Sequence, residues 1–76
     1  MQQPKITNEE LLKVIIDYIT THNYSPTVRD LMNLTDIQSS STMHYRIKQL
    51  RDNGFIDYVD SEPRTIRVIG YKFMKE

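Results

Sequence analysis

The spacing of apolar residues changes once along this chain, at Asn53-Gly54. Before that point apolar residues recur every three or four positions, which is typical of helices with one buried face. After it they alternate with polar residues, which is typical of strands. The chain has 76 residues, which is room for one core only. We therefore expect a single domain over residues 1–76 that is mainly α with a small β-hairpin, its core over about residues 6–69 and its tail over residues 70–76.

Two helices are expected in the first half of the chain. The first covers about residues 8–21, because Thr7 and Glu10 can form a capping box in front of a stripe of leucines and isoleucines. The second is short and covers about residues 28–33, with Thr27 as its N-cap. Each helix has an apolar face that would pack into the core.

A third helix is expected between a polar turn and Gly54. Thr35-Asp36 interrupts the helical pattern, and Asp is one of the few non-glycine residues that tolerate a left-handed turn conformation, which we expect at Asp36. Ser39 or Ser40 would cap the helix, and Gly54 would take the left-handed position at its end. The residues expected to be buried by this helix and the chain just after it are Met43, Ile47, Leu50, Phe55 and Ile56.

The last third of the chain predicts a two-stranded hairpin. One strand would cover residues 55–59 and the other residues 64–69, with a turn at residues 60–63. Ile66 and Val68 would share one face of the second strand. The tail, which contains Tyr71, Phe73 and Met74, could extend that strand.

Composition and charge exclude several classes of function. The ten Lys and Arg balance the ten Asp and Glu, but residues 37–56 carry three basic residues and one acidic one. There is no cysteine, and His22 and His44 alone are poor material for a metal site. We find no catalytic triad, no glycine-rich phosphate loop, no signal peptide and no membrane-spanning run. We expect a cytoplasmic protein that is not an enzyme and needs no metal or cofactor.

The polar face of the third helix suggests contact with DNA. Three helices followed by a hairpin are the layout of a winged helix-turn-helix, whose third helix enters the major groove of DNA. Small hydroxyl residues at the start of that helix would let it approach closely. The alternative is an ordinary solvated face behind a serine-rich cap.

Several blocks of the sequence resemble the N-terminal DNA-binding domain of the LexA repressor family. The resemblance covers about Ile6 to Ile69, and the blocks stand in the family's order without a gap. They are Ser25-Pro26-Thr27-Val28-Arg29-Asp30, Ser39-Ser40-Ser41-Thr42-Met43-His44-Tyr45-Arg46-Ile47-Lys48-Gln49-Leu50, Gly54-Phe55-Ile56 and Pro63-Arg64-Thr65-Ile66-Arg67-Val68. The family patterns are S-P-T-V-R-E, S-S-x-S-T-V-H-Y-x-L-K-x-L, G-Y-I and P-R-x-I-R-V.

The resemblance implies a winged helix-turn-helix that binds operator DNA and represses transcription. The residues it assigns to base readout are Ser39, Ser41, Thr42, His44 and Tyr45. The residues expected to contact phosphates are Ser40, Arg29, Arg46, Lys48, Arg64 and Arg67. For Arg64 and Arg67, pairing across the hairpin with Asp57 or Glu62 is an equal expectation.

Two departures from the family shape the expected function. The family's second domain, a self-cleaving serine protease that also dimerises the repressor, has no counterpart in this sequence. The sequence is therefore either a small stand-alone repressor of the kind that a phage or mobile element encodes, which we favour, or a fragment of a longer protein. We expect it to bind DNA as a homodimer through its last strand or tail. The wing carries Asp57, Asp60 and Glu62, which would repel phosphate. This acidity favours the alternative function, a winged helix that binds another protein instead of DNA.

Overall fold

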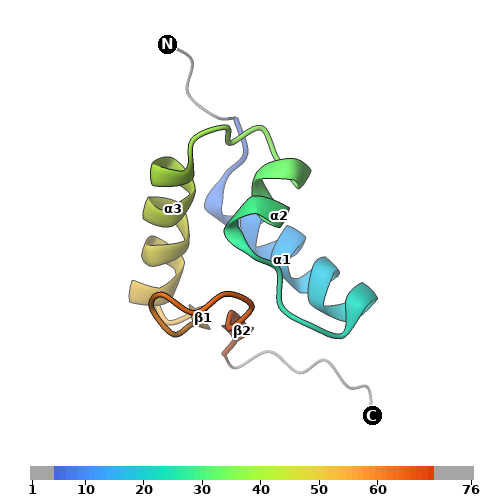
Figure 1. The fold of residues 1–76 in the computed structure, drawn as a ribbon. Coiled ribbons are helices and arrows are strands. Elements are labelled where there is room, and N and C mark those ends of the chain that lie inside the picture. The colour runs from blue at the N-terminus through green and yellow to red at the C-terminus, as the bar shows by residue number, and fades with distance from the viewer. Residues whose placement is uncertain (1–4, 70–76) are drawn as a thin grey trace.

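The computed structural model describes residues 5–69. The described chain forms three helices and two short strands. Figure 1 shows that the small hairpin lies at the C-terminal end of the last helix. The elements are α1 (Asn8–His22), α2 (Val28–Leu34), α3 (Ser40–Asp52), β1 (Ile56–Asp57) and β2 (Arg67–Val68). The strands are antiparallel. This order confirms the predicted fold class, a mainly α winged helix-turn-helix.

The helices begin where the sequence predicts because local caps define their first turns. At α1 the Glu10 amide donates to the Thr7 hydroxyl at 3.0 Å, and the Thr7 amide donates to the Glu10 carboxylate at 2.9 Å. Thr27 and Asp30 form the same capping box at α2. Ser39, rather than Ser40, caps α3. These caps satisfy amide groups that would otherwise have no partner inside the helix.

The turn between α2 and α3 differs from the prediction. The left-handed turn expected at Asp36 is wrong, because non-glycine residues with positive φ occur, within residues 5–69, only at Asn23, Ser61 and Arg64. Instead α2 ends on Thr35 in extended backbone, at φ −133° and ψ 177°. The Thr35 hydroxyl donates to the Leu31 carbonyl at 2.8 Å and accepts from the Ile37 amide at 3.2 Å. A side chain therefore makes this turn, and no left-handed residue is needed.

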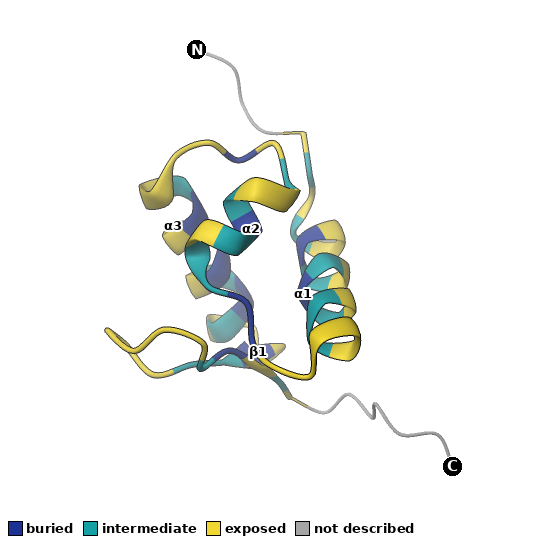
Figure 2. Ribbon diagram, turned by 45° about the vertical axis from the view of Figure 1, so that its right-hand side comes forward, coloured by how far each residue is buried: buried dark blue, intermediate teal, exposed yellow. Residues whose placement is uncertain are grey.

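The core is a single apolar cluster between the three helices and the hairpin (Figure 2). Its buried members are Leu11, Ile15, Leu31, Ile37, Met43, Ile47, Leu50, Ile56 and Ile66. The predicted stripe of α3 is confirmed. The prediction for Phe55 is wrong, because its side chain is 48% exposed. The prediction for Ile56 is confirmed, because its side chain is buried in the core. The two neighbours differ because successive side chains point to opposite faces once the chain has become a strand.

The hairpin is shorter than predicted, with two residues in each strand. Ile56 pairs with Val68 and Asp57 pairs with Arg67. At the next hydrogen-bonded position the Thr65 side chain replaces the backbone, because the Val59 amide donates to the Thr65 hydroxyl at 2.9 Å. The Ile66 amide points away from β1 and donates to the buried Ser25 hydroxyl at 2.9 Å. The predicted extension by the tail concerns residues 70–76, which lie outside the described part of the chain. None of the helices over residues 5–69 has the length and apolar character needed to span a membrane.

Candidate nucleic-acid interface

The N-cap and the first two turns of α3 carry the side chains that the sequence assigned to base readout. Ser39, Ser41, His44 and Tyr45 are exposed, and Thr42 is half-buried. Tyr45 is 62% exposed, the most of any large apolar side chain in the described chain. Met43 and Ile47, on the opposite face, hold the helix to the core. The structure thus brings these five residues together on one exposed helix end.

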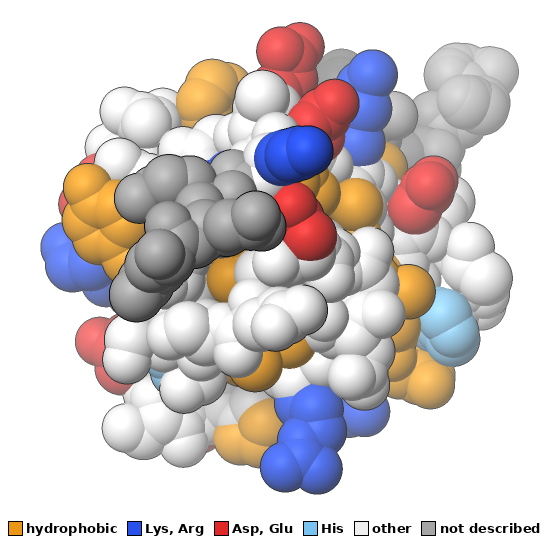
Figure 3. Space-filling model, turned by 90° about the horizontal axis from the view of Figure 1, so that it is seen from above, with side chains coloured by type: hydrophobic (Ala, Val, Ile, Leu, Met, Phe, Trp, Pro, Cys, Tyr) orange, Lys and Arg blue, Asp and Glu red, His pale blue; other side chains and the backbone are white. Residues whose placement is uncertain are grey.

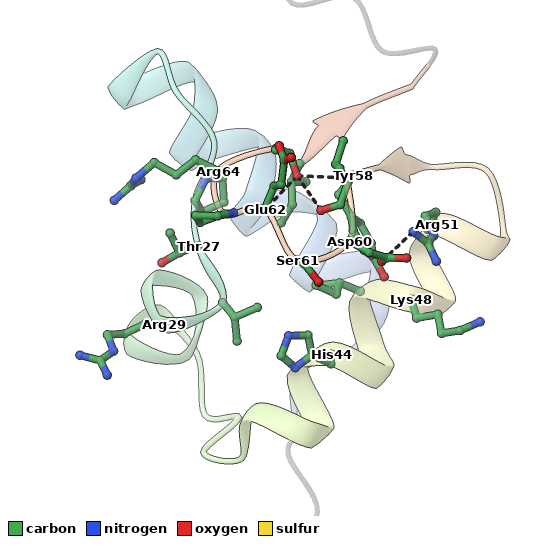
Figure 4. A pocket seen from close by; sticks show the side chains of 17 residues that line it. Thr27, Arg29, His44, Lys48, Arg51, Tyr58, Asp60, Ser61, Glu62 and Arg64 are labelled. Atoms are coloured by element: carbon green, nitrogen blue, oxygen red, sulfur yellow. Dashed lines mark hydrogen bonds and ion pairs between the residues drawn. The ribbon is translucent and has the colours of Figure 1, made fainter.

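The ring of His44 has a defined orientation. Its Nδ1 lies 2.9 Å from the Ser40 carbonyl oxygen. A carbonyl oxygen only accepts hydrogen bonds, so Nδ1 must carry the proton. In this tautomer Nε2 is the acceptor atom of the ring. Figure 4 shows His44 on the side of α3 that faces α2.

A groove of about 570 Å³ separates the start of α2, the side of α3 that carries His44 and Lys48, and the wing loop, residues 58–66 (Figure 4). Apolar side chains such as Val28 and Ile47 contribute to its walls. Its charged and polar lining residues are Thr27, Arg29, His44, Lys48, Arg51, Tyr58, Asp60, Ser61, Glu62, Arg64 and Thr65. Cations and carboxylates therefore face each other across the same space.

Three of the basic residues near α3 are paired with carboxylates. Lys48 pairs with Asp52 at 3.2 Å, one turn along the helix. Arg51 pairs with Asp60 of the wing at 3.3 Å and also lies over the ring of Tyr58. Arg67 pairs with Asp57, its cross-strand neighbour, at 3.4 Å. Exposed pairs of this kind contribute only about 0–1 kcal/mol, so phosphates can compete for the cations.

Two arginines that were expected to contact phosphates instead connect parts of the fold. Arg46 is half-buried, and its guanidinium donates to the Asn8 side chain and to the Ile6 carbonyl, in α1 and just before it. Arg64 donates to the Ser25 carbonyl at 2.9 Å and pairs with Asp30 at 3.2 Å. The structure therefore does not bring Arg46 together with the exposed residues of α3, and the cross-strand pairing predicted for Arg64 is wrong.

Two other residues that were predicted to contact phosphates, Ser40 and Arg29, do not connect parts of the fold in this way within residues 5–69. Ser40 is exposed on the first turn of α3. Arg29 is exposed on α2, and within residues 5–69 it forms no ion pair. Figure 3 shows the molecule from above, where Lys and Arg lie beside Asp and Glu and neither sign covers the surface. On that face, therefore, basic side chains do not form a continuous positive surface.

The ion pair between Arg64 and Asp30 predicts that the folded domain becomes less stable in acid. The Thr27 backbone amide, the Tyr18 hydroxyl and the Arg64 guanidinium hold the pKa of Asp30 below its ordinary range. A lowered carboxylate pKa adds stability at neutral pH, and this stability is lost as the pH falls below about 4. We expect the melting temperature of Asp30→Asn to fall less than that of the wild type between pH 6 and pH 3. Parallel melting curves for the two proteins would contradict this role.

The arrangement defines a class of protein. A short α2, a tight turn and an exposed α3, followed by a hairpin that packs beside α3, make a winged helix-turn-helix domain. A family model described as the LexA DNA binding domain matches residues 5–65. This chain therefore belongs to the LexA DNA-binding domain family.

Individual relatives are similar over the same region. The chain is 38% identical to the LexA repressor of Desulforamulus reducens over 61 residues, which are 80% of this chain and 28% of that protein. It is 31% identical to the LexA repressor of Clostridium tetani over 68 residues, 90% of this chain and 34% of that protein. A transcription regulator LexA of Synechocystis sp. is 28% identical over 64 residues, 84% of this chain and 32% of that protein. The chain thus spans about a third of the length of these curated relatives.

Proposed function

We propose that this domain binds double-stranded DNA sequence-specifically and represses transcription, in the manner that the names of its relatives indicate. The observation that carries the proposal is the exposed start of α3, where hydroxyl, imidazole and phenol groups lie on one face. A helix fits the major groove, in which each base pair presents a distinct pattern of donors and acceptors. In this proposal Ser39, Ser41, Thr42, His44 and Tyr45 read bases. The phosphate contacts are Ser40, Arg29, Lys48 and Arg67.

The domain is too small to read a long operator alone. Helix-turn-helix proteins commonly bind two half-sites about one helical turn apart, each with one copy of the domain. We infer that two copies of the domain bind one operator. We also propose that the protein is located in the cytoplasm, where it can reach the DNA. A stand-alone role and an origin in a phage or mobile element stay predictions.

Nuclear magnetic resonance tests the proposal directly. Backbone amide shifts of the labelled domain would be followed while a duplex of mixed sequence is added at low and at moderate salt. We expect the largest shifts at residues 39–46, with α1 unchanged. If no shift occurs even at low salt, DNA binding is excluded. The acidic wing would then point to the second candidate function, recognition of a protein partner.

Lys48 is expected to contribute affinity without specificity. Replacing it with alanine removes a charge that a phosphate can bind in place of Asp52. Binding should weaken on every duplex, and the slope of log K against log salt should become shallower by about 0.9. The control is Lys13→Ala, which removes an exposed lysine of α1. Equal effects of the two variants would contradict a phosphate contact at Lys48.

Asp60 is expected to restrain DNA binding. Its carboxylate pairs with Arg51 and lies in the wing, where it would repel phosphate. We expect Asp60→Asn to raise the affinity for any duplex about two- to fivefold, because Arg51 becomes available. Asp17→Asn changes the net charge equally on α1 and serves as the control. An affinity below that of the wild type would show instead that the pair positions the wing for binding.

A further inference from the structure

A chain of side-chain hydrogen bonds connects the base of α1 to the exposed face of α3. The Arg46 guanidinium donates to Oδ1 of Asn8. The Asn8 amide nitrogen donates to Oε1 of Gln49 at 3.1 Å. The Gln49 amide nitrogen lies 3.3 Å from the hydroxyl oxygen of Tyr45. We call these four residues the relay.

The direction of the relay follows from its first member. A guanidinium has only donors, so the oxygen of the Asn8 amide must face Arg46. The Asn8 nitrogen then faces Gln49, which must present its own oxygen there. This leaves the Gln49 nitrogen toward Tyr45, so the Tyr45 hydroxyl oxygen accepts a hydrogen bond. Its O–H proton remains free to donate outward.

We propose that Arg46, Asn8 and Gln49 are positioning residues that fix the Tyr45 hydroxyl as a hydrogen-bond donor to an acceptor on a base edge. Guanine, thymine and adenine present acceptors in the major groove, whereas cytosine presents only its amino donor. The base that Tyr45 reads therefore carries an acceptor, and cytosine is disfavoured at that position. The relay also gives Arg46 a role that does not involve phosphate.

This proposal rests on the proposed function, since it concerns how α3 reads DNA. A phosphate oxygen is an acceptor too, and it could take the same proton. The two contacts differ in outcome, because a phosphate contact carries no sequence information. The test must therefore compare sequences and not affinity alone.

Single substitutions can reverse the direction of the hydrogen bonds within the relay. In Asn8→Asp both carboxylate oxygens accept, so Gln49 must turn its nitrogen toward residue 8 and its oxygen toward Tyr45. The Tyr45 hydroxyl then donates its proton to the Gln49 oxygen. It can therefore only accept a hydrogen bond from DNA. In Gln49→Glu the carboxylate at position 49 only accepts, so the Tyr45 hydroxyl donates to it without any change at residue 8. Asn53→Asp adds the same charge at the far end of α3 and is the matched control.

The experiment selects binding sites from a random duplex pool with the wild type and each variant, and measures binding to site variants that differ at one base pair. We expect the wild type to disfavour cytosine about fivefold to tenfold at one position, the gain of one hydrogen bond. Tyr45→Phe should lose this discrimination there alone. Asn8→Asp and Gln49→Glu should reverse it in favour of cytosine, and Asn53→Asp should behave as the wild type does.

The outcomes separate this proposal from the function on which it rests. If the wild type selects no site, the proposed function fails. If it selects a site whose preferences survive Tyr45→Phe, or if Tyr45→Phe weakens all duplexes equally, base readout by Tyr45 is wrong. If Tyr45→Phe acts at one position but neither reversing variant changes the preference there, the relay does not set the donor.

Discussion

Replacing Ile37 with alanine is expected to lower the free energy of unfolding by about 2–5 kcal/mol. Its side chain is fully buried, and it joins the core cluster from the turn between α2 and α3. The substitution leaves a cavity in the segment that sets the angle between the two helices. The free energy of unfolding of a natural domain is about 5–15 kcal/mol in total, so the loss is a large share of its stability.

Urea unfolding followed by circular dichroism measures this effect. Leu34→Ala is the matched control, since Leu34 is three residues earlier and 55% exposed. We expect that variant to remain within about 0.5 kcal/mol of the wild type. Equal losses in the two variants would show that Ile37 does not hold the turn.

The double substitution Ser41→Ala with Tyr45→Ala is expected to reduce binding to the selected operator about 10- to 1000-fold. The two side chains are exposed one turn apart on α3. Losing two base contacts at about 0.7–2 kcal/mol each costs about 1.4–4 kcal/mol in total, which corresponds to this range. Binding to random duplex should stay nearly unchanged, because neither residue carries charge. The core face of α3 is untouched, so the fold should persist.

Fluorescence anisotropy with operator and random duplexes measures the ratio of the two affinities. Lys48→Ala provides the contrast, since it should weaken both equally. If the double variant also weakens both duplexes by the same factor, Ser41 and Tyr45 contact the backbone and the assignment of base readout is wrong.

The fold was predictable where its causes are local in sequence. The capping boxes of Thr7 and Thr27 join residues three positions apart, and the apolar stripe of α3 repeats at helical spacing. Ile37 gave no such signal, because it is an isolated apolar residue in a polar stretch. Phe55 was misplaced because the face that a strand buries depends on where the preceding helix stops.

The exposed face of α3 was predictable in the same way, but the partners of its cations were not. Arg46 bonds to residues 38 and 40 positions away, and Arg64 bonds to Ser25, 39 positions away. Arg51 pairs with a wing residue whose position depends on the hairpin turn. The sequence shows that such residues are charged, and only the packing shows which of them remain available for DNA.

The central claim is that the exposed face of α3 recognises a DNA sequence, and selection from a random double-stranded pool at two salt concentrations tests it most directly. We predict enrichment of one motif at both concentrations, with half-sites about one helical turn apart. Total binding should fall at the higher salt while the motif stays the same. No enrichment at either concentration would contradict the claim.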